Sequence, residues 1–223
     1  MQFTKTSTSV QLEGHRLQHW IVGQTTDVLD HIHDSHVSMA IQERNQSVDT
    51  AEINHFLKQN LEVRASGSID AIMVEVMSTL DPTIFKTLMK DLSATLTRFD
   101  EIMEVAEYRL LLASINTNMC RRFHTDINDV RLLCTYTGPG TLWLTNDNIN
   151  RRALDSYDGN ESIVIDPELI QQVPEGAIAL LKGAMYPHHQ TKAIVHRSPT
   201  IEESGEKRLL LRIDTNATTK VWN

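Results

Sequence analysis

The chain has 223 residues, of which 40% are hydrophobic and 22% are charged, a composition typical of a globular protein with a sizeable core. Its formal net charge of −8 argues against nucleic acid or an anionic membrane as a partner. We find no run near the roughly 18 apolar residues of a membrane span, and the first residues lack the apolar segment of a signal peptide. These features predict a cytoplasmic protein.

The first part of the chain predicts helices. Asp49 can cap a helix, and Glu52 follows three residues later in the pattern of a capping box. A second stripe of apolar residues at helical spacing covers 69–80, and the Asp-Pro pair at 81–82 is typical of the start of a third helix. We therefore expect residues 1–100 to form a helical N-terminal region.

A histidine cluster precedes these helices, with His31, His33, Asp34 and His36 close together. Such side chains can bind a divalent metal. Their spacing matches no established ligand pattern, so we interpret them as solvated side chains at a helix end and the following turn.

From about residue 107 the pattern changes to short apolar runs bounded by Gly, Pro, Asn and Asp. The runs are YRLLLASIN, VRLLCTYT, TLWLT, SIVID, AIALLKG, KAIVH and KRLLLRID. Short strands separated by turn signals are typical of a β-sandwich or barrel, and their number suits a jelly roll. We predict an α+β protein in which a C-terminal double-stranded β-helix, residues 101–223, forms a metal-binding core with the helical region packed on it as one compact unit.

A His-x-Asp pair lies just before one of these runs. Residues two apart in a strand point to the same face, so His124 and Asp126 can bind one metal ion together. The best candidate for a third ligand is His196, at the end of another apolar run, with His188 and His189 as substitutes. Two His and one carboxylate leave open positions on the metal and suit non-haem Fe(II).

Basic residues alternate on the last predicted strand. Arg208 and Arg212 share one face of the run that follows His196, and an arginine there could bind a carboxylate through two parallel hydrogen bonds. The alternative is a solvent-exposed strand face. Lys182, at the end of AIALLKG, either lines the mouth of a cavity or ends a strand.

This order of residues resembles the Fe(II)/2-oxoglutarate-dependent oxygenases on the double-stranded β-helix. The resemblance implies that His124, Asp126 and His196 bind iron and that Arg208, with Arg212 as the substitute, binds the distal carboxylate of 2-oxoglutarate. It also implies that Tyr136, on a neighbouring strand, helps to hold this cosubstrate.

A closer resemblance is to a bacterial family of unknown function with a cupin-like core. The matching blocks are CRRFHTD, RLLCTYTGPGTLW, LLKG and VHRSP…RLLLRID, within residues 107–214. The genes of that family are described beside zinc-homeostasis genes, which makes zinc an alternative metal. Cys120, four residues before His124, could then complete a tetrahedral site, whereas the plain interpretation of Cys120 and Cys134 is small residues in a β core.

Three functions follow from these observations. The first is an oxygenase that uses Fe(II) and 2-oxoglutarate to hydroxylate an unidentified small-molecule or protein substrate. The second is a cupin-like zinc-binding protein of metal homeostasis. The third is a metal-free binding module in which the His-Asp-His set is accidental.

Overall fold

The computed structural model describes residues 18–45, 47–187 and 192–215. Its strands are β1 (Trp20–Gly23), β2 (Met39–Gln42), β3 (Glu62–Gly67), β4 (Tyr108–Ile115), β5 (Val130–Thr137), β6 (Leu142–Leu144), β7 (Gln171–Gln172), β8 (Ile178–Lys182), β9 (Val195–Arg197) and β10 (Arg208–Thr215). Its α-helices are α1 (Thr50–Lys58), α2 (Ile69–Thr79), α3 (Lys86–Met103), α4 (Arg151–Asp155) and α5 (Asn160–Ile163), and its 3₁₀ helices are η1 (Thr26–His33), η2 (Asn146–Asn148) and η3 (Pro167–Leu169). Within the described part of the chain, no helix is both long and apolar enough to cross a membrane.

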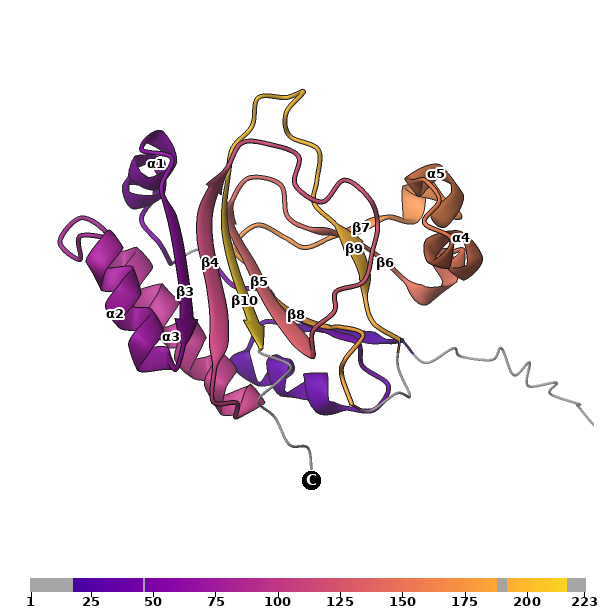
Figure 1. Ribbon diagram of the computed structural model, residues 1–223, viewed down its shortest axis with the longest axis horizontal. Coiled ribbons are helices and arrows are strands. Elements are labelled where there is room, and N and C mark those ends of the chain that lie inside the picture. Colours follow the sequence, from indigo (N-terminus) through magenta and orange to yellow (C-terminus); the bar gives the residue numbers. More distant parts are fainter. Residues whose placement is uncertain (1–17, 46, 188–191, 216–223) are drawn as a thin grey trace, which may run out of the picture.

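Two sheets face each other. The large sheet has the strand order β1-β2-β8-β5-β10-β4-β3, and the small sheet has the order β7-β6-β9. Helices α1, α2 and α3 lie on one side of the large sheet, and the small sheet with α4 and α5 lies on the other (Figure 1). The small sheet therefore covers part of the inner face of the large sheet, and a site can form between the two sheets.

Strand alternation divides the apolar residues into separate cores. On β10, Leu209 and Leu211 pack in the cluster that includes the residues of α1–α3, whereas Leu210 packs in the cluster between the two sheets. On β5, Leu132 joins the first cluster and Leu133 the second. The central strands are buried on both faces, which explains their continuous apolar runs.

The structure confirms the mixed α+β class and corrects the expectation that residues 1–100 are purely helical. β1, β2 and β3 add three strands to the large sheet. The first two have only four residues each, too few for alternation to predict a strand.

The predicted strand at 162–166 instead contains the end of α5 and one isolated bridge, between Ile149 and Val164. The division of the chain at residue 100 stays a prediction.

The helix starts agree only in part with the capping pattern. Asp49 caps α1 as predicted, since its side chain accepts a hydrogen bond from Ala51 N. Glu52 does not complete a capping box. Its carboxylate accepts hydrogen bonds from the backbone N–H groups of Thr87 and Leu88 in the first turn of α3. This contact places the start of α3 at Lys86 instead of at residues 81–82, because the four first N–H groups of a helix need acceptors.

A buried carboxylate connects the helices to the outer face of the large sheet. Asp91 of α3 is 7% exposed and accepts hydrogen bonds from both Nη atoms of Arg44, at 2.7 and 2.8 Å, from Ser47 Oγ at 2.6 Å and from Tyr136 Oη of β5 at 2.8 Å. Burial alone would raise the pKa of Asp91, but these hydrogen bonds hold it below its ordinary value.

Replacing Asp91 should therefore destabilise the fold. We expect Asp91→Asn to lower the free energy of unfolding at neutral pH by about 3–5 kcal/mol, because it removes the buried charge of Asp91 and leaves the partly buried Arg44 without its counter-charge. The control Glu101→Gln, at an exposed position of the same helix, should change it by less than about 0.5 kcal/mol. Urea denaturation measures both.

The pH dependence follows from the lowered pKa of Asp91. The stabilisation is complete above the unfolded-state pKa of about 4 and is lost as the pH falls through the lower folded-state pKa. The difference between the wild type and Asp91→Asn should therefore shrink in acid. Equal urea midpoints for Asp91→Asn and Glu101→Gln at neutral pH would contradict the role of this contact.

Candidate metal centre

Two histidines meet across a pair of backbone hydrogen bonds. His124 N–H donates to the carbonyl of His196 at 3.0 Å, and His196 N–H donates to the carbonyl of His124 at 2.9 Å, which makes an isolated antiparallel bridge beside the small sheet. Directly opposed residues of an antiparallel pair project to the same face. The imidazole rings therefore lie side by side, with their centroids 4.8 Å apart.

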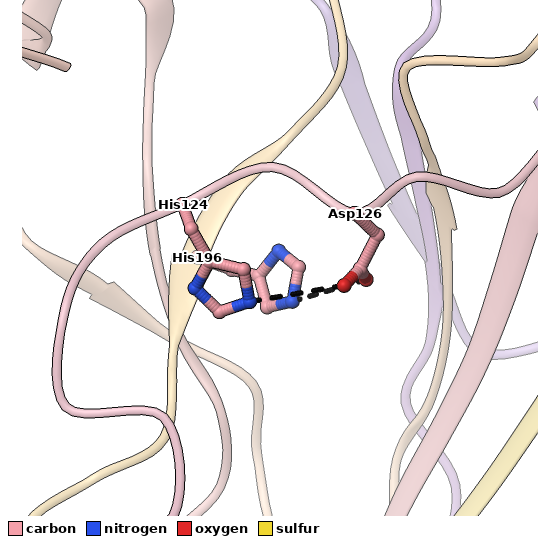
Figure 2. Close-up of side chains that lie close together, drawn as sticks. All are labelled: His124, Asp126 and His196. Carbon is pink, nitrogen blue, oxygen red and sulfur yellow. Dashed lines mark ion pairs between the residues drawn. The ribbon is translucent and has the colours of Figure 1, made fainter. Parts of the chain in front are cut away.

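The carboxylate of Asp126 completes the group. Its Oδ2 lies 3.3 Å from His196 Nε2 and its Oδ1 lies 3.7 Å from His124 Nε2. Figure 2 shows both rings presenting a nitrogen toward this carboxylate. One ligand atom from each of the three residues lies within 4.8 Å of the others. The structure thus brings together the three residues that the sequence predicted as metal ligands.

The outer nitrogen of each ring faces a backbone carbonyl. His124 Nδ1 lies 2.9 Å from the carbonyl of Arg122, and His196 Nδ1 lies 3.3 Å from the carbonyl of Ile194. A carbonyl only accepts, so Nδ1 carries the proton, and in the neutral ring Nε2 offers a lone pair toward Asp126. This orientation by a second partner is the usual arrangement of metal-binding histidines.

Asp126 belongs to a series of ion pairs with Arg131 and Asp214. Asp126 Oδ2 lies 2.5 Å from Arg131 Nη1, and Arg131 Nε lies 2.6 Å from Asp214 Oδ1, which also accepts a hydrogen bond from Asn128 at 2.9 Å. Burial alone would raise the pKa of Asp126, but His196, Arg131 and His124 lower it to about 2. The carboxylate is therefore ionised at neutral pH.

A small pocket opens beside the three residues. Its lining includes His124, His196, Arg131, Arg212 and Cys120, and its volume is about 40 Å³. That volume suits about one water molecule, so a larger ligand would require the lining side chains to move.

Cys120 lies at this pocket but outside the His-Asp-His group. A hydrogen bond with His124 lowers the pKa of Cys120 below its ordinary value. Cys134 is fully buried in the outer core, as the plain interpretation expected. Cys120 is exposed, so that interpretation is wrong for Cys120.

Arg208 and Arg212 both project from β10 toward the space between the sheets, on the same face as Leu210. Arg208 is 1% exposed and donates a hydrogen bond to Thr135 Oγ1 at 3.1 Å. Among the described residues, no carboxylate lies within ion-pair distance of it, and its Nε has no partner. Burial lowers the pKa of Arg208 to about 10.

Arg212 is more exposed than Arg208, and unlike Arg208 it has a carboxylate nearby. Its side chain is 31% exposed, and its Nε lies 3.3 Å from Asp214 Oδ2. The deeply buried, uncompensated cation on this face is therefore Arg208.

The structure corrects the role expected for Tyr136. This residue follows Thr135 on β5, so it points to the opposite face of the sheet. It is buried in the outer core, and its hydroxyl donates to Asp91. Thr135 takes the place beside Arg208 that we expected for Tyr136. The alternation in VRLLCTYT, with Arg131, Leu133 and Thr135 on one face, is the signal that could have identified it.

Several other candidates lie away from the group. His31 pairs with Asp34 at 2.8 Å, and His33 contacts the hydroxyl of Tyr186 and the carbonyl of Ile102, so the expectation that all of these imidazoles are merely solvated is wrong for His33. Within the described residues neither belongs to a metal-binding group, and nor does His36. His188 and His189 lie outside the described residues.

Lys182 is buried and is the last residue of β8, as one of the two alternatives predicted. Its Nζ donates to the carbonyl of Asp34 and lies 4.3 Å from the centroid of the Tyr186 ring. The residue also lines a surface pocket near Thr125. Burial lowers its pKa to about 8.

One solved structure has a similar mixed α+β fold, and two others give lower scores. The dioxygenase for auxin oxidation 1 from Arabidopsis thaliana, in a binary complex with 2-oxoglutarate, aligns with a TM-score of 0.52 and 10% identity, over 89% of this chain and 92% of that chain. The rice dioxygenase for auxin oxidation gives 0.49 and 11%, over 87% and 81%. A Pseudomonas putida prolyl-4-hydroxylase gives 0.46 and 10%, over 84% and 96%.

None of the curated proteins matches this chain. A family model described as "Protein of unknown function (DUF1826)" matches residues 23–214. This range covers most of the chain and contains His124, Asp126, His196 and the buried Arg208, so the chain belongs to the DUF1826 family.

Proposed function

We propose that the protein is a non-haem Fe(II)- and 2-oxoglutarate-dependent oxygenase that hydroxylates a small-molecule or protein substrate. In this proposal His124, Asp126 and His196 hold the metal, and Arg208 with Thr135 holds the distal carboxylate of 2-oxoglutarate. When bound, Fe(II) and 2-oxoglutarate together supply the activation of O₂. The protein residues orient these groups and exclude water from them.

The observation that carries the proposal is the uncompensated charge of Arg208. A buried guanidinium without a counter-ion is costly, and Arg208 donates only to a neutral hydroxyl, Thr135 Oγ1. A dicarboxylate would supply the missing anion, and an arginine with an adjacent hydroxyl can bind a carboxylate oxygen from two sides. If β10 had a purely structural role, Arg208 would not need an anion beside it.

The path between the metal-binding group and Arg208 runs along the inner face. The small pocket is lined by Leu133, Leu210, Thr141 and Ser198 in addition to the two histidines. Leu210 lies opposite Thr135 in the register of β10 and β5 and is two residues from Arg208 on the same face of β10, so the pocket and Arg208 are neighbours along this strand. A five-carbon dicarboxylate exceeds the volume of about 40 Å³, so we expect exposed side chains at the pocket entrance to rotate when it binds.

The first test concerns the metal ligands. We expect His196→Ala to weaken binding of Mn(II), a spectroscopic substitute for Fe(II), by at least about 100-fold, since loss of outer-shell partners alone costs 10- to 100-fold. The control His31→Ala removes an exposed imidazole that pairs with Asp34, away from the His-Asp-His group, and should bind Mn(II) like the wild type. Electron paramagnetic resonance of free Mn(II) measures both affinities. Unchanged binding by His196→Ala would rule out this centre.

The second test distinguishes iron-type from zinc-type coordination at Cys120. The proposal predicts that Cys120 is not a ligand, so the Co(II)-loaded wild type should lack thiolate-to-metal charge-transfer absorption. Cys120→Ser should give the same Co(II) spectrum. A strong charge-transfer band that disappears in Cys120→Ser would instead support the zinc-binding alternative, because a thiolate ligand suits zinc.

The third test concerns the cosubstrate. Arg208→Met should weaken 2-oxoglutarate binding to the Mn(II)-loaded protein by about 2–5 kcal/mol, or roughly 30- to 4,000-fold. Arg208→Lys should weaken it less, because lysine keeps the charge and loses the two-pronged contact. Isothermal titration calorimetry measures the affinities, and Mn(II) binding should be unchanged in both variants.

The controls for this test use the other arginines. Arg152→Met, at an exposed position of α4, should bind 2-oxoglutarate like the wild type. If Arg212→Met abolishes binding while Arg208→Met does not, the carboxylate belongs to Arg212. If the metal-loaded wild type binds no 2-oxoglutarate, the oxygenase proposal fails.

A further inference from the structure

A second and larger hollow lies on the strands next to the metal-binding group. Three arginines from adjacent strands line it: Arg64 of β3, Arg109 of β4 and Arg212 of β10, together with Ser66 and, from α2, Glu75. Its volume is about 670 Å³, within the range of pockets that bind small molecules. We call it the arginine groove.

Strand register explains why these arginines gather. Arg212 lies opposite Leu111 of β4, and Leu111 lies opposite Arg64 of β3. In the next row, Asp214 lies opposite Arg109, and Arg109 lies opposite Ser66. Residues in register project to the same face, so all three arginines lie on the face that carries Arg208. The strands are about 4.8 Å apart, which places Arg64 and Arg212 roughly 10 Å apart across the groove.

Arg212 connects the groove to the metal-binding group. The same side chain lines the small pocket that contains His124 and His196 and the arginine groove. A molecule bound in the groove can therefore extend past Arg212 to the metal position, and the two hollows can act as parts of one site.

The positive charge in the groove is incompletely neutralised. Arg109 has no ion pair within the part of the chain that the structure describes. Arg64 pairs with Glu62, but the two side chains are 65% and 48% exposed, and such surface pairs contribute little. Asp214, the partner of Arg212, also pairs with Arg131. The lining thus carries three guanidinium groups and one carboxylate, Glu75, in a chain with a net charge of −8.

We propose that the arginine groove binds an anionic group, a carboxylate or a phosphate, on the small-molecule substrate that is presented to the metal. Guanidinium groups bind both anions through paired hydrogen bonds, and Ser66 adds a hydroxyl donor. This inference rests on the oxygenase proposed above for the metal position, but anion binding by the groove itself requires neither metal nor 2-oxoglutarate.

The test uses inorganic phosphate and acetate as probes on the metal-free full-length protein. Arginine side chains are labelled with ¹⁵N, and the Nε–H signals are followed by nuclear magnetic resonance at constant ionic strength. We expect the signals of Arg64, Arg109 and Arg212 to shift together along one saturating curve. The signal of Arg152 should stay nearly constant, because this residue lies on α4, away from the groove.

Substitutions assign the effect to the groove. Arg109→Gln should weaken phosphate binding at least about tenfold, since hydrogen bonds between charged groups contribute roughly 1.5–3 kcal/mol. Arg64→Gln should also weaken it. The matched control Arg152→Gln makes the same charge change elsewhere and should leave the affinity unchanged. Circular dichroism confirms that each variant is folded.

The results distinguish a phosphate-bearing from a carboxylate-bearing substrate. They also test the groove independently of the oxygenase proposal. Tighter binding of phosphate than of acetate supports a phosphate-bearing substrate, and the reverse supports a carboxylate. Shifts that do not saturate, or that are identical in Arg109→Gln and Arg152→Gln, overturn the groove as an anion site. Because metal and 2-oxoglutarate are absent, failure of the Arg208 test would leave this result unaffected, and failure here would leave the metal and cosubstrate tests standing.

Discussion

The candidate site depends on one reciprocal pair of backbone hydrogen bonds, between His124 and His196. These residues are 72 positions apart in the chain, yet their N–H and C=O groups face each other and place both imidazoles on one side. A shift of the pairing by one residue would turn one ring to the opposite face. The bridge thus fixes both imidazoles at once, and Asp126 follows His124 by two residues.

The loop that carries Asp126 is held by close backbone contact. Ala184 N–H donates to the carbonyl of Asp126 and Gly183 N–H to that of Asp129, both at 2.8 Å. A Cβ on Gly183 would lie 2.1 Å from Asn128 Oδ1 and 2.2 Å from its carbonyl oxygen, so only glycine permits this approach. The end of β8 therefore positions the carboxylate, and Arg131 with Asp214 holds its charge from behind.

The large sheet separates two kinds of polar chemistry by strand alternation. On the side that faces the helices, Asp91 forms an ion pair with Arg44 and accepts a hydrogen bond from the hydroxyl of Tyr136. These charges are therefore paired, and they stabilise the fold. Toward the small sheet, Arg208 has only Thr135, and the arginine groove has more cations than anions. Within the described residues, the arginines of the large sheet that lack an ion pair, Arg208 and Arg109, thus lie on the inner side, beside the paired Arg131 and Asp214.

The sequence by itself determined the mixed α+β class and the central strands, and it predicted His124, Asp126 and His196 as metal ligands, because apolar runs and a His-x-Asp spacing are local patterns. The tertiary structure alone decided the rest. It assigned β1–β3 to the large sheet, since short or exposed edge strands have no clear period. It also placed Tyr136 on the face of β5 opposite to Arg208 and placed Thr135 beside Arg208. Which face of a strand meets which partner depends on register between distant segments, and no spacing within one segment encodes that register.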